Sequence, residues 1–123
     1  MARILLVEDS ELAGDALRTL LEVAGHRVTL VGSVADAIAA AGRDAPEVVL
    51  LDLVLPDGNG LEIARHVGRS DHPPVIAALT GFDAPEVVAD CTAAGCRAVL
   101  LKPLPTRELI ARIDEWLQAT RPA

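Results

Sequence analysis

The stretch Val48-Val-Leu-Leu-Asp52 decides the fold, because it is apolar throughout and then stops at an acid. A strand without polar alternation is buried on both faces, as in a parallel sheet covered by helices. Three other runs have the same form: residues 3–7 end in Glu8 and Asp9, residues 75–79 in Thr80, and residues 98–101 in Lys102. The carboxyl ends of parallel strands lie along one edge, where ligands bind. The sequence therefore predicts that these polar residues share one pocket.

Helical patterns separate the strand patterns. Apolar residues recur at helical spacing over 13–24, and Gly25 is expected to end that helix. Strands are expected at 27–31 and 47–51, and a short helix at 61–67 follows a turn-rich loop. Strict alternation of strands and helices predicts an α/β fold, a parallel sheet with helices on both faces.

Helix starts are assigned from capping residues. Capping is expected at three places: Ser33 with Asp36, Asp83 with Glu86, and Thr106 alone. The first of these helices is expected over 34–41, ending at Gly42, and the last turns its apolar side inward.

The composition limits the function. The chain has 123 residues, half of them hydrophobic, which predicts a single domain over 1–123 with its core at 3–119 and a short tail at 121–123. The net charge of −7 disfavours direct contact with nucleic acid. No apolar run is long enough to span a membrane, and no signal peptide precedes the first strand, so a cytoplasmic protein is expected.

The acids at the strand ends predict a cation site. Two like charges about 5 Å apart at an effective dielectric of about 20 repel by roughly 3 kcal/mol, so Glu8, Asp9 and Asp52 require a counter-charge. Carboxylate oxygens favour Mg²⁺, which leaves room for a phosphate oxygen, and Lys102 supplies a mobile positive charge. An aspartate beside Mg²⁺ can attack phosphorus and form an aspartyl phosphate.

The chain resembles the receiver domain of two-component response regulators. The resemblance rests on four motifs and covers essentially the whole chain: Leu5-Leu-Val-Glu-Asp9, residues 49–58, Leu79-Thr-Gly81 and Leu101-Lys-Pro103. It implies a flavodoxin-like (βα)5 sheet in the order 2-1-3-4-5.

The resemblance also implies a role for each site residue. Asp52 would accept a phosphoryl group from a histidine kinase or a histidine phosphotransfer protein, and Thr80 and Lys102 would bind its oxygens. Asp9, Asp52 and the main-chain carbonyl of Val54 would hold Mg²⁺, with Glu8 acting through water. The Lys102–Pro103 bond is typically cis in such domains. The output surface would comprise the fourth helix, fifth strand and fifth helix, and its partner is left unknown.

Two aromatic positions of the family pattern are missing. Val99 replaces the ring usually found three residues before the lysine, and Leu104 replaces the one after Lys-Pro. We therefore hypothesise that phosphorylation is transmitted through the loop after Thr80 and the fourth helix, without a ring flip. Phe82, the only phenylalanine, either packs on that helix or covers the phosphoryl group against water.

Two other classes of function compete with the phosphorylation switch. The missing aromatics suit a phosphate-independent scaffold, whereas the complete set of five site residues suits a switch. A phosphatase with an aspartyl nucleophile generally needs a second acid where this chain has Val54, so no turnover enzyme is expected. Whether the chain is a complete regulator or part of a hybrid kinase or a larger regulator is left open.

The remaining titratable residues are assigned structural places. His26, His66 and His72 occur in polar surroundings and are expected at the surface. Cys91 and Cys96 have neither redox nor zinc spacing, and the interpretation as small buried residues is preferred to that of a redox pair.

Overall fold

A computed structural model describes residues 2–120. The short tail expected at 121–123 lies outside the described residues. Five parallel strands form the main sheet, in the order β2-β1-β3-β6-β7. These strands are β1 (Arg3–Val7), β2 (Arg27–Val31), β3 (Val48–Asp52), β6 (Val75–Thr80) and β7 (Ala98–Leu101). The order confirms the predicted flavodoxin-like 2-1-3-4-5 arrangement.

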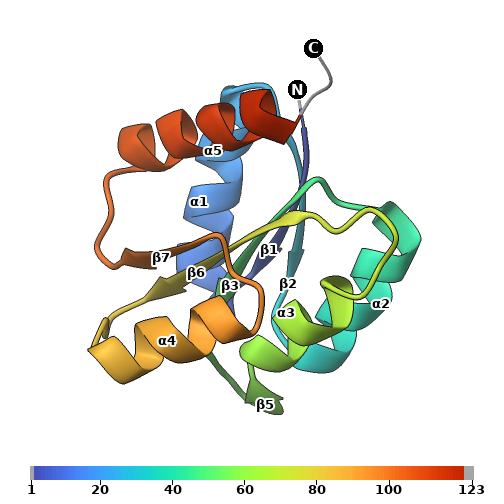
Figure 1. The fold of residues 1–123 in the computed structure, drawn as a ribbon. Helices are drawn as coiled ribbons and strands as arrows, with labels where there is room; N and C mark the ends of the chain where they lie inside the picture. Colours follow the sequence, from blue (N-terminus) through green and yellow to red (C-terminus); the bar gives the residue numbers. More distant parts are fainter. Residues whose placement is uncertain (1, 121–123) are drawn as a thin grey trace.

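Five helices cover the two faces of this sheet (Figure 1). They are α1 (Glu11–Val23), α2 (Val34–Asp44), α3 (Leu61–Val67), α4 (Pro85–Ala93) and α5 (Thr106–Thr120). One core contains Leu5, Val49 and Ile76 with residues of α2, α3 and α4. The other contains Ile4, Leu50 and Ala77 with residues of α1 and α5. Alternate residues of each central strand thus belong to different cores, which explains why these strands are apolar throughout.

Three helix ends differ from the prediction. Helix α2 continues through Gly42 to Asp44 and stops at the left-handed Ala45, just before Pro46, where helical backbone is disfavoured. Ala84, not Asp83, is the N-cap of α4, because its carbonyl accepts the hydrogen bond of Val88.

Thr106 is the first residue of α5 rather than its cap. The carbonyl of the preceding Pro105 accepts from Leu109 N–H at 3.1 Å, so the helical hydrogen bonds begin one residue earlier than expected. Ser33 caps α2 as predicted, its hydroxyl accepting from Asp36 N–H at 3.1 Å.

The loop expected after β3 contains a small hairpin. Strands β4 (Val54–Leu55) and β5 (Gly58–Asn59) pair antiparallel, with Pro56 and Asp57 at the turn. Leu55 is buried and joins the core beneath α2 and α3, while Val54 is 77% exposed. The hairpin is therefore anchored on one side and open on the other.

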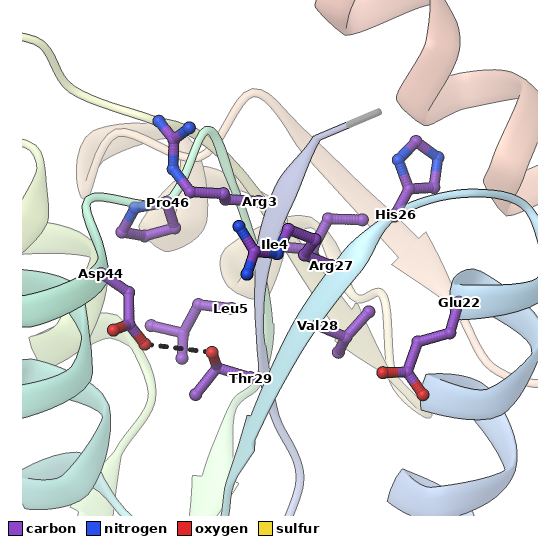
Figure 2. A pocket seen from close by; sticks show the side chains of 10 residues that line it. All are labelled: Arg3, Ile4, Leu5, Glu22, His26, Arg27, Val28, Thr29, Asp44 and Pro46. Carbon is purple, nitrogen blue, oxygen red and sulfur yellow. Dashed lines mark hydrogen bonds between the residues drawn. The ribbon is translucent and has the colours of Figure 1, made fainter.

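His26 is buried, so the prediction that it lies at the surface was wrong. Its Nδ1 accepts from Ala2 N–H at 3.2 Å, and its Nε2 lies 3.9 Å from Asp114 Oδ1 of α5. His66 and His72 are exposed, as predicted. His26 borders a cavity of about 450 Å³ at the amino-terminal ends of β1 and β2 (Figure 2). In that cavity the Thr29 hydroxyl donates to Asp44 Oδ2 at 3.0 Å, which attaches the end of α2 to β2.

Candidate functional site

Three acids meet at the carboxyl edge of the sheet. Asp52 is the last residue of β3, and Glu8 and Asp9 directly follow the neighbouring β1. One carboxylate oxygen from each lies within 4.8 Å of the others. The side chains of Glu8 and Asp52 are 13% and 20% exposed, whereas Asp9 is exposed. The predicted convergence of the three acids is thus present.

Lys102 completes this cluster from the end of β7. Its Nζ lies 3.4 Å from Asp52 Oδ2 and 3.6 Å from Glu8 Oε2. The Lys102 N–H donates to the carbonyl of Thr80 at 2.7 Å, which holds the two strand ends together. The Lys102–Pro103 bond is cis, as the family resemblance implied. Lys102 therefore bridges two acids while its side chain remains 39% exposed.

The three acids outnumber this lysine, and the pKa of Glu8 responds to both its burial and these charged neighbours. Burial raises the pKa of Glu8, and its hydrogen bond with Asp52 raises the pKa further, while Lys102 opposes both effects. Three carboxylates against one ammonium leave a formal excess of two negative charges. All three donors are hard oxygens, and they are open to solvent at Asp9. This donor set fits a hydrated divalent cation such as Mg²⁺.

Thr80 lies at the same edge but is held by its own loop. Its hydroxyl donates to the carbonyl of Phe82 at 3.1 Å and accepts from Phe82 N–H at 3.1 Å. Thr80 is only 7% exposed, whereas Phe82 is 65% exposed. The ring of Phe82 is therefore largely open to solvent. Val99 packs against the core shared with α4, and Leu104 against the opposite core.

The backbone after Asp52 passes close to the acids. Val54 N–H donates to Asp52 Oδ1 at 3.4 Å, and Gly60 N–H returns to the carbonyl of Leu53 at 2.9 Å. A Cβ on Gly60 would overlap the main-chain oxygen of Asp52. Gly60 thus permits the approach that positions the phosphoacceptor candidate, a role that sequence reasoning missed. The position of Gly60 directly before a predicted helix was the sequence feature that could have indicated this role.

Together these features define a doubly wound α/β domain with a cluster of three acids and a lysine at its carboxyl edge. Residues 4–114 match the family described as "Response regulator receiver domain", and the chain belongs to this family. It is therefore a signalling domain of two-component response regulators rather than a turnover enzyme.

Relatives of known description agree with this assignment. The chain is 38% identical over 120 residues to the probable transcriptional regulatory protein TcrX of Mycobacterium tuberculosis, covering 95% of this chain and 50% of TcrX. It is 34% identical over 122 residues to the transcriptional regulatory protein AfsQ1 of Streptomyces coelicolor, covering 96% of this chain and 52% of AfsQ1. The chain spans about half the length of these relatives.

Solved receiver domains share the fold. The non-phosphorylated HemR receiver domain of Leptospira biflexa is 30% identical with a TM-score of 0.89, covering 100% of this chain and 99% of that one. A CheY-like receiver from Methanospirillum hungatei is 26% identical with a TM-score of 0.91, covering 97% and 95%. The beryllofluoride-activated receiver domain of RstA from Klebsiella pneumoniae is 26% identical with a TM-score of 0.86, covering 94% and 98%.

Among residues 2–120, no helix is long and apolar enough to cross a membrane.

Proposed function

We propose that Asp52 is the phosphoacceptor of this receiver domain. The observation that carries the proposal is the position of its carboxylate, at the end of a buried strand between two further acids and Lys102. The phosphoryl donor is a histidine kinase or a histidine phosphotransfer protein. A carboxylate oxygen of Asp52 attacks phosphorus, the phosphorus–nitrogen bond breaks, and the histidine nitrogen takes up a proton. The product is an aspartyl phosphate.

Charge neutralisation is the main task of the other residues. Asp9, Asp52 and the Val54 carbonyl would hold Mg²⁺, with Glu8 acting through water, and the ion would neutralise charge on the transferred phosphoryl group. Lys102, now paired with Asp52 and Glu8, moves to the phosphoryl oxygens. Thr80 exchanges its hydrogen bond with Phe82 for one to phosphate. The domain thus assists its own phosphorylation and the later hydrolysis of its aspartyl phosphate.

Phosphorylation of the purified chain by acetyl phosphate with Mg²⁺ tests this function. We expect a mass gain of one phosphoryl group in the wild type and none in Asp52→Asn, which keeps the shape but removes the nucleophile. Asp83→Asn, at an exposed acid outside the cluster, is the matched control and should be phosphorylated normally. An unmodified wild type, or a modified Asp52→Asn, would contradict the proposal.

We further propose that the domain acts in the cytoplasm and switches the surface of α4, β7 and α5. Two buried, unpaired cysteines, Cys91 and Cys96, fit a reducing compartment. Burial raises the pKa of Cys96 to about 12, which disfavours the reactive thiolate and supports a packing role for both cysteines. The names of the relatives do not identify the partner of the switched surface, because this chain spans only half of their length.

A further inference from the structure

Asp57, at the turn of the β4–β5 hairpin, is attached to a helix distant in sequence. Its Oδ1 accepts from Val34 N–H at 2.7 Å, and its Oδ2 accepts from Ala35 N–H at 3.1 Å. These are the first two N–H groups of α2, which have no partner within the helix. The two bonds lower the pKa of Asp57, so the carboxylate is charged where the positive end of the helix dipole favours it.

The hairpin held in this way carries the backbone of the proposed metal site. Val54 opposes Asn59 in the hairpin, and Val54 N–H reaches Asp52 Oδ1. On the core side, Leu55 is buried in the same cluster as Val34, the residue whose N–H binds Asp57. Asp57 therefore fixes the turn of the hairpin to the start of α2, while Leu55 anchors the other side of the hairpin in the core that includes Val34.

We propose that Asp57 is a positioning residue that fixes the Val54 backbone for the divalent cation through its bonds to the start of α2. This inference rests on the proposed function of Asp52 and its neighbours. Asp57 does not contact the acid cluster itself, since its two oxygens bind α2. Asp57 lowers the entropy cost of cation binding, because the hairpin already has the conformation that the cation requires.

Ser33 provides a matched control at the same helix end. Its hydroxyl caps α2 by accepting from Asp36 N–H, but it makes this bond within its own segment and does not hold the hairpin. Loss of either cap should destabilise α2, while only loss of Asp57 releases the hairpin. Asp57→Asn keeps one acceptor oxygen and places an amide group opposite the other N–H, so it should restore part of the attachment.

Mg²⁺ titration of the whole chain by calorimetry tests the proposal, with unfolding followed in parallel without metal. We expect Asp57→Ala to weaken Mg²⁺ binding about tenfold, the lower end for groups that support a metal ligand, Asp57→Asn to weaken it less, and Ser33→Ala to change it by less than about twofold. Amide exchange should also speed up over residues 53–60 in Asp57→Ala but not in Ser33→Ala.

Equal Mg²⁺ affinities of Asp57→Ala and Ser33→Ala would overturn the proposal, as would a wild type that binds no Mg²⁺. If Asp57→Ala does not fold, an Mg²⁺ affinity of Asp57→Asn equal to that of the wild type also overturns it. A wild type that binds Mg²⁺ but accepts no phosphoryl group would instead refute the function of Asp52. The two failures are therefore distinguishable.

Discussion

The hydroxyl of Thr80 donates to the Phe82 carbonyl and accepts from Phe82 N–H, and the donated bond has to break before the hydroxyl can donate to a phosphoryl oxygen. The contact uses only backbone atoms of Phe82, so its exposed ring is free for another task. Val54, two residues after Asp52, is also exposed. We predict that these two side chains slow the hydrolysis of an aspartyl phosphate by excluding water from it.

Removal of the ring tests this role of Phe82. In Phe82→Ala the backbone contacts with Thr80 can persist, so phosphorylation should continue while loss of phosphate becomes several-fold faster. The half-life of the phosphorylated form, followed by mass spectrometry, is the measurement. Phe82→Leu retains apolar bulk and should lie closer to the wild type. A Phe82→Ala half-life equal to that of the wild type would rule out the covering role.

At the level of elements, the buried His26 holds three segments together at the start of β1. His26 lies in the turn between α1 and β2, accepts from Ala2 just before β1, and faces Asp114 of α5. Its Nδ1 serves as the acceptor for the main-chain N–H that directly precedes the strand. The imidazole therefore acts as an internal cap for the first strand.

Loss of this cap should destabilise the fold without affecting the site at the other end of the sheet. His26→Ala leaves the buried Ala2 N–H without an acceptor, which should lower the free energy of unfolding by about 2 kcal/mol. Urea denaturation measures the change, and His26→Asn, which offers an oxygen acceptor, should recover part of it. His72→Ala, at an exposed histidine, should shift stability by less than about 0.5 kcal/mol. Equal effects at the two histidines would contradict the assignment.

Local sequence predicted those elements whose ends depend on local chemistry. The bounds of β1, β2 and β7 and the cap at Ser33 were correct, because an apolar strand or a hydroxyl cap is determined within a few residues. The burial of His26 depends on α5, 88 positions away at Asp114, and its polar sequence neighbours conceal it. Asp57 resembled an ordinary turn residue, since its partner Val34 lies 23 residues earlier. The acid cluster was predictable because the direction of parallel strands alone brings their ends together.

At the scale of the whole molecule, the site and the proposed output surface share the loop that follows β6. Thr80 ends β6, and residues 81–84 lead directly into α4. Val99 of β7 and Val87 of α4 both pack against the core on that side of the sheet. A displacement of Thr80 toward phosphate would therefore act on α4 through the connecting loop, without an aromatic ring in β7.

Hydrogen exchange of the complete chain tests this route. With Mg²⁺ and beryllofluoride, amide exchange over residues 81–95 should slow, because the loop after Thr80 becomes ordered when its hydroxyl binds the phosphoryl mimic. Asp52→Asn, treated in the same way, should show no change, and neither should β2 at the far edge of the sheet. Unchanged exchange over residues 81–95 in the wild type would refute transmission through this loop.

The central strands, whose alternate residues enter different cores, also limit how this chain can change during evolution. Insertion of one residue into β3 would exchange the side chains at Val49 and Leu50 between the two cores and displace Asp52 from the edge. A substitution disturbs one position, whereas such a shift disturbs a whole strand. Differences in length between descendants of this sequence should therefore accumulate in connections such as residues 69–74, while the spacing from Val48 to Asp52 stays constant.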